Sequence, residues 1–273
     1  MRRSAAVAAV VVLALLVSAC SRLSFVRPSA ARGDSEQVAP TYEFRGESRA
    51  ERGRMAARRH VSTAEVELRR GDVEAADKSL RAALREDGEL PEAHTLLGVV
   101  EESRGRDAQA GVHYERAAML APRTGSMLNN YGAWLCGNGR AAESLGWFDR
   151  ALADPGYATR ASALANAGAC AARAGQYGRV ERDLRAALQL DPGNMVGLGA
   201  MAEEQDRQGN ALQARAFVER RLAAGRPTPE MLTLAAKIER QLGDNAAASR
   251  YLEQLGREFP QSANAQPRNP GRP

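Results

Sequence analysis

Six glycine residues at nearly constant spacing constrain the fold of this chain more than any other feature. Successive members of the set are 34, 34, 36, 34 and 34 residues apart. The six are Gly71, Gly105, Gly139, Gly175, Gly209 and Gly243. A period of this length predicts repeated two-helix units, each stacked on its neighbours, and not one globular core.

Other positions of the repeat support the same interpretation. In residues 91–124, Leu97 and Gly98 precede the turn glycine, and Tyr114 and Pro122 follow it. This order resembles the tetratricopeptide repeat (TPR), a helix-turn-helix unit of about 34 residues. Glycine tolerates positive φ in the turn, small residues let helices approach closely, and proline ends the second helix. We therefore expect an all-α, right-handed superhelical solenoid of six TPR units at 57–90, 91–124, 125–160, 161–194, 195–228 and 229–262.

The first 20 residues have the features of a targeting segment. Two arginines precede the apolar stretch Ala5–Ala19, which is shorter than the roughly 20 residues that span a membrane. Residues Leu16 to Cys20 resemble a bacterial lipobox, which implies a signal peptide at 1–19 and acyl chains, including palmitate, on Cys20. Ser21 resembles the residue that accompanies export to the outer membrane, where the anchored chain would face the periplasm. The alternative is an ordinary secretory signal with a cysteine there by chance.

The segments that flank the repeats are expected to be flexible. Prolines and glycines lie among small and charged residues in 20–47, so we expect this segment to be a lipidated flexible tether. The solenoid would then occupy 48–262. Residues 263–273 follow Pro260, lack helical periodicity and are expected to be a disordered tail.

Composition and motifs exclude several classes of function. Loss of Arg2 and Arg3 with the signal peptide lowers the formal net charge from +5 to +3, which is too small for a nucleic-acid interface. The sequence has no catalytic, metal-binding or phosphate-binding motif. We therefore expect no enzyme activity, cofactor, metal or small-molecule substrate. His60 and His94 occupy the same position in consecutive units, which favours a packing role for both.

Two cysteines lie within the repeats, on the first helices of consecutive units. They are Cys136 and Cys170. Helix axes about 8–10 Å apart can bring facing Cα atoms within disulfide range, and an oxidising compartment favours the bond. We expect a Cys136–Cys170 disulfide that fixes the centre of the array. The alternative is two buried free thiols.

The first helices of TPR arrays line a groove, faced by unit positions 2, 5, 6, 9, 12 and 13. Val61 and Leu68 in unit one and Val99 in unit two place apolar side chains at such positions. Asn130 and Asn166 place amides at position 6 of units three and four. Apolar side chains that are open to solvent, together with amides, suit an extended peptide partner.

Two alternatives stay open for this groove. Residues 40–56 could cover its apolar positions, and the two asparagines could bond to neighbouring helices. Units five and six place charges on the same face, at Glu203, Asp206, Arg207, Lys237 and Arg240. A carboxylate clamp of the chaperone-binding type needs lysine where Val61 stands, which excludes that kind of partner.

The central repeats resemble a particular family. The runs Asn129–Gly132, Leu135-Cys136 and Asn166–Gly168, with Phe148 and Cys170, are similar to the PilW/PilF family of type IV pilus biogenesis lipoproteins, the TPR pilotins. The resemblance covers the lipobox and all six units. It implies a non-catalytic outer-membrane lipoprotein that binds the type IV pilus secretin and promotes its outer-membrane localisation and multimerisation, and through it twitching motility.

One departure and two other classes of function stay open. Val180 stands where this family has a small residue, which could widen the helix packing there. A general TPR scaffold lipoprotein for envelope or cell-wall assembly would share the fold. An accessory periplasmic enzyme is opposed by the missing catalytic site.

Overall fold

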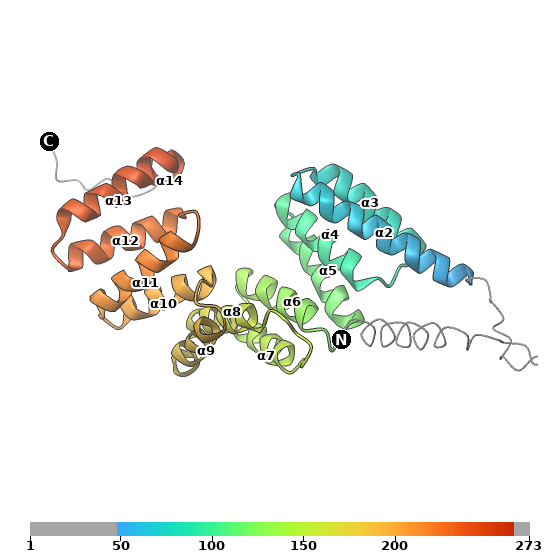
Figure 1. Cartoon of the computed structure of the whole chain (residues 1–273), viewed down its shortest axis with the longest axis horizontal. Coiled ribbons are helices and arrows are strands. Elements are labelled where there is room, and N and C mark those ends of the chain that lie inside the picture. The colour runs from blue at the N-terminus through green and yellow to red at the C-terminus, as the bar shows by residue number, and fades with distance from the viewer. Residues whose placement is uncertain (1–47, 265–273) are drawn as a thin grey trace, which may run out of the picture. The chain divides into compact units, whose positions relative to one another are not determined.

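The computed structural model describes residues 48–264, and this part of the chain consists of helices joined by short turns, without a strand (Figure 1). The expected signal peptide, Cys20, the tether at 20–47 and all but the start of the tail lie outside the described residues. The fold is all-α, and the helices follow one another as antiparallel pairs.

Within residues 48–264 the pairs match the six repeats. In chain order the helices are α2 (Arg49–Arg69), α3 (Val73–Glu86), α4 (Pro91–Ser103), α5 (Asp107–Leu120), α6 (Gly125–Gly137), α7 (Ala141–Leu152), α8 (Arg160–Arg173), α9 (Tyr177–Leu190), α10 (Met195–Arg207), α11 (Ala211–Ala224), α12 (Pro229–Gln241), α13 (Asn245–Glu258) and α14 (Pro260–Asn264). The even-numbered helices from α2 to α12 are the first helices of their units, and each packs against the helix that follows it.

All six spaced glycines lie in the turns inside these pairs. Their φ angles are positive and range from 69° at Gly105 to 83° at Gly243. A side chain is strained in this conformation, so glycine is the residue that closes the hairpin at least cost. The glycine period therefore marks the turns of the solenoid.

The core is a series of clusters between adjacent helices, as expected for a solenoid. Its large members include residues nine positions after turn glycines, and three of these, Leu80, Phe148 and Leu184, are fully buried. Small residues face them. A Cβ atom built on Gly98 would lie 2.7 Å from the Tyr114 ring, and one on Gly168 would lie 2.6 Å from Leu184. These glycines are sites of close helix approach.

The one 36-residue interval in the glycine spacing has a structural cause. The linker between α7 and α8 is longer than the other linkers between units. Asp154 in this linker accepts hydrogen bonds from the backbone N–H groups of Gly125, at 2.8 Å, and Gly156, at 2.8 Å. These bonds lower the pKa of the Asp154 carboxyl. Tyr157 is buried against Gly125. The extra residues thus hold the start of α6.

One expectation about the C-terminal end is wrong. Residues after Pro260 lack helical periodicity, yet Pro260–Asn264 form the short helix α14, which packs against α13. The fixed φ of proline suits the first turn of a helix, where no N–H is needed.

Candidate functional site

The candidate site is the face of the array formed by the first helices, here called the groove face. At its N-terminal end lies a cavity of about 250 Å³, the first-unit cavity. Its walls are Arg58, Val61, Ser62 and Glu65 of α2, with Leu90 and Glu92 at the start of α4. The α2 residues are unit positions 2, 5, 6 and 9, so the position rule identifies this face correctly.

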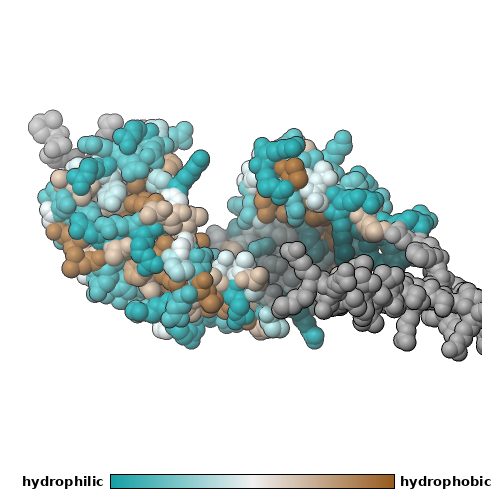
Figure 2. All heavy atoms as spheres, in the orientation of Figure 1, coloured by the Kyte–Doolittle hydropathy of each residue, from teal (hydrophilic) through white to brown (hydrophobic). Residues whose placement is uncertain are grey.

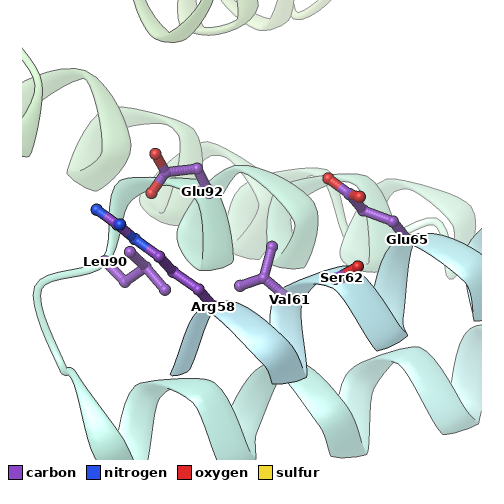
Figure 3. Close-up of a pocket in the computed structure, with 6 residues that line it drawn as sticks. All are labelled: Arg58, Val61, Ser62, Glu65, Leu90 and Glu92. Carbon is purple, nitrogen blue, oxygen red and sulfur yellow. The ribbon is translucent and has the colours of Figure 1, made fainter. Parts of the chain in front are cut away.

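Val61 is less accessible than we expected. Its exposed fraction is 7%, and it packs in a core cluster with Ala64 and Leu90. The expectation of a solvent-accessible Val61 is therefore wrong. Figure 3 shows the cause: the side chain points from α2 toward α4 and Leu90, and Arg58 extends beside it. Val61 forms a wall of the cavity and leaves little of its own surface open.

The other two expected apolar residues are more open. Leu68 is half-buried against the same core cluster. Val99 on α4 is 40% exposed. Residues 40–47 lie outside the described part, so coverage of the groove by that segment stays an alternative.

The centre of the groove face is cross-linked in two ways. Cys136 on α6 and Cys170 on α8 are joined by a disulfide, with Cα atoms 5.9 Å apart, inside the usual range. The Asn166 side-chain N–H donates to the Asn129 side-chain oxygen, 3.1 Å away, between the same helices. For Asn166 the alternative of a hydrogen bond to a neighbouring helix is therefore correct. Asn130, one residue after Asn129, is half-buried.

Sequence reasoning missed three contributors to this face. Leu90 precedes Pro91 and closes the first-unit cavity, although it lies outside the groove positions. Asn129 is the partner of Asn166. Arg173 places its guanidinium 3.8 Å from Cys136 Sγ. The signal for Asn129 and Arg173 was present, because both occupy groove positions of their units.

Several expected groove charges are already used in ion pairs. Lys237 Nζ lies 2.5 Å from Asp206. Arg207 lies 2.6 Å from Glu204, and its guanidinium stacks 4.0 Å from the Tyr177 ring centre. The Lys237–Asp206 pair links α12 to α10, the Arg207–Glu204 pair lies within α10, and the Arg207–Tyr177 stack links α10 to α9. All three contribute to stability before any partner binds.

The histidines have no metal-binding arrangement. His60 is half-buried. His94 Nδ1 lies 3.2 Å from His113 Nδ1, and His94 Nε2 lies 3.4 Å from the Gly88 carbonyl oxygen. If Nε2 of His94 donates to Gly88, His113 must donate to His94 Nδ1. Burial lowers the pKa of both. Among residues 48–264, no three potential metal ligands come together.

The face of the described residues that Figure 2 shows is mainly hydrophilic. Figure 2 shows hydrophobic residues in small separate groups on one face. None of the described helices is long and apolar enough to cross a membrane.

No family model matches the chain, but comparison with single proteins finds type IV pilus proteins both by sequence and by structure. The type IV pilus assembly protein PilF of Pseudomonas aeruginosa is 26% identical over 199 residues, which cover 73% of this chain and 79% of that protein. The crystal structure of PilW, described as a widely conserved type IV pilus biogenesis factor, is 28% identical with a TM-score of 0.68 and covers 76% of this chain and 96% of that one. The structure of P. aeruginosa PilF, 24% identical with a TM-score of 0.66, covers 77% and 94% and shares the fold.

Proposed function

We propose that this chain, a homologue of PilF with the TPR fold of the type IV pilus biogenesis proteins PilW and PilF, is a non-catalytic pilotin. In this role it is an outer-membrane lipoprotein that binds the pilus secretin and promotes its localisation and multimerisation. The observation that carries the proposal is the first-unit cavity on the groove face of a PilF-like array.

The lipid anchor is the first part of the proposal. The segment Leu16 to Cys20 supports acylation of Cys20, and Ser21 supports export to the outer membrane. Several acyl chains hold a protein on a membrane stably where a single chain does not. The tether at 20–47 would give the array a reach on the order of 30 Å from the membrane.

The peptide-binding face is the second part. The first-unit cavity has an apolar floor, formed by Val61 and Leu90, between charged rims formed by Arg58, Glu65 and Glu92. This combination fits one aliphatic side chain of an extended secretin segment, with polar groups around it. Leu68 on α2 and Val99 on α4 add apolar side chains at further groove positions. The disulfide between α6 and α8 keeps the neighbouring part of the face in one shape, which lowers the entropy cost of binding.

The TPR fold of the chain favours a scaffold role. TPR arrays typically bind other proteins, and Lys237 of this groove is paired with Asp206 of the neighbouring first helix. We therefore assign no reaction to the chain.

Co-isolation of the secretin from detergent-solubilised envelopes tests the proposal. Val99→Asp places a charge on the groove face, and we expect it to lower the recovered secretin by at least about tenfold, equivalent to about 1.4 kcal/mol. Val112→Asp is the matched control, because Val112 is 66% exposed on α5, away from the groove face. Equal recovery from both variants would place the contact elsewhere. Capture of other envelope proteins without the secretin would favour a general scaffold.

A further inference from the structure

A second cavity lies on the groove face, in the last unit. Its volume is about 530 Å³, within the range of about 300–1,000 Å³ that is usual for ligand pockets. We call it the C-terminal cavity, and it is lined by Glu203 of α10, by Pro229, Glu230, Thr233, Leu234 and Lys237 of α12, and by Ser262 of α14. The α12 residues include unit positions 2, 5, 6 and 9, the same positions through which α2 lines the first-unit cavity.

The charges around the C-terminal cavity do not balance. The cationic Lys237 is neutralised by Asp206, whose carboxylate oxygen is 2.5 Å from Nζ and whose side chain is only 8% exposed. Among the described residues, no ion pair includes Glu203 or Glu230. Two carboxylates therefore line the cavity without a close ion pair.

Glu203 and Glu230 are both exposed side chains of the cavity lining. Desolvation raises the pKa of the Glu203 carboxyl, an effect that Arg173 partly opposes. A positive group that binds beside these two carboxylates gains Coulomb attraction. A neutral or anionic ligand would gain no such attraction.

The rest of the lining suits the stem of a long side chain. Pro229 and Leu234 are half-buried apolar residues in the cavity wall. Arginine and lysine lay their methylene groups along such surfaces while the charged head reaches polar groups. The cavity thus combines an apolar wall with two acidic groups.

We propose that the C-terminal cavity binds an arginine or lysine side chain of an extended partner segment. The stem lies against Pro229 and Leu234, and the cationic head pairs with Glu203 and Glu230. This inference goes beyond the proposed function, because it does not require the partner to be the secretin.

The test uses the mature chain and a fluorescent pentapeptide probe, acetyl-Ala-Ala-Arg-Ala-Ala. A second probe carries citrulline in place of arginine, which has nearly the same shape without the charge. Fluorescence anisotropy measures both dissociation constants at low and high salt. We expect the arginine probe to bind at least about tenfold more tightly, with an advantage that shrinks as salt rises.

Variants locate the site. The double substitution Glu203→Gln and Glu230→Gln should abolish the advantage of the arginine probe, while Glu253→Gln, an exposed carboxylate of α13, should leave it unchanged. Circular dichroism checks that each variant stays folded. Equal affinity for both probes, or an unchanged advantage in the double variant, would overturn the proposal. Binding seen only after removal of residues 265–273 would also overturn it, because the chain's own Arg268 and Arg272 would then be the occupant.

Discussion

Replacement of Gly168 by leucine tests the close helix packing of the repeats. A Cβ atom there would lie 2.6 Å from Leu184 and 3.2 Å from the backbone oxygen of Val180. Leu184 is fully buried, and a backbone oxygen cannot rotate away. Overpacking of this kind costs about 1–3 kcal/mol, and the upper end applies because several carbon atoms are added. The higher helix propensity of leucine offsets about 0.8 kcal/mol, so we expect a net loss of about 2 kcal/mol.

Thermal unfolding followed by circular dichroism measures this loss. For an array of this size, about 2 kcal/mol corresponds to a Tm lower by about 4–8 °C. Gly146→Leu is the matched control, because no atom lies within 4 Å of a Cβ at this exposed helical glycine. It should raise Tm by about 2 °C through helix propensity alone. The same sign of change in both variants would refute the assignment of Gly168 to a site of close approach.

Three further predictions concern the bridge, the histidine pair and the anchor. Replacing Cys136 and Cys170 together by alanine should lower the free energy of unfolding, measured in urea, by up to about 4 kcal/mol. Mass spectrometry of a non-reducing digest of the wild-type chain should recover the two cysteine peptides linked. Free alkylatable thiols at both positions would contradict the pairing. The folded-state pKa values of His94 and His113 lie below the unfolded value of 6.5. Below that pH the unfolded chain therefore binds more protons than the folded chain. The contribution of the two histidines to stability is full above pH 6.5 and is lost as pH falls. His113→Gln should reduce the loss of stability between pH 7 and pH 5, and an unchanged pH profile would rule out the pair as its source. Cys20→Ser should remove the protein from the outer-membrane fraction without lowering the Tm of the array, and a variant that stays in that fraction would exclude lipid anchoring there.

The fold could be predicted in detail because its information is periodic. Each turn glycine, small residue at a close contact and large core residue recurs about once in 34 positions, so six imperfect copies support one another. The same repeat register predicted that Cys136 and Cys170 lie opposite each other on first helices of consecutive units. The features that were missed are those that occur once. Asp154 and Tyr157 hold the start of α6 through contacts that no repeat position encodes.

The candidate site could be predicted only in outline. Unit positions gave the direction of each side chain, and both cavities are lined from those positions. They did not give the depth of burial, which depends on what the next unit places opposite. Val61 is covered because Leu90 and the start of α4 lie over it, whereas Val99 at a similar position stays 40% exposed. The pairing of Asn166 with Asn129 also depended on tertiary distance.

The state of the pilus secretin in cells that lack this protein tests the central claim most directly. Inner- and outer-membrane fractions would be separated, and secretin monomers and multimers measured in each. We predict that outer-membrane multimers are lost, that the wild-type chain restores them, and that the Val99→Asp variant restores them poorly while Val112→Asp restores them fully. Normal secretin multimers in the outer membrane of the deletion strain would contradict the account.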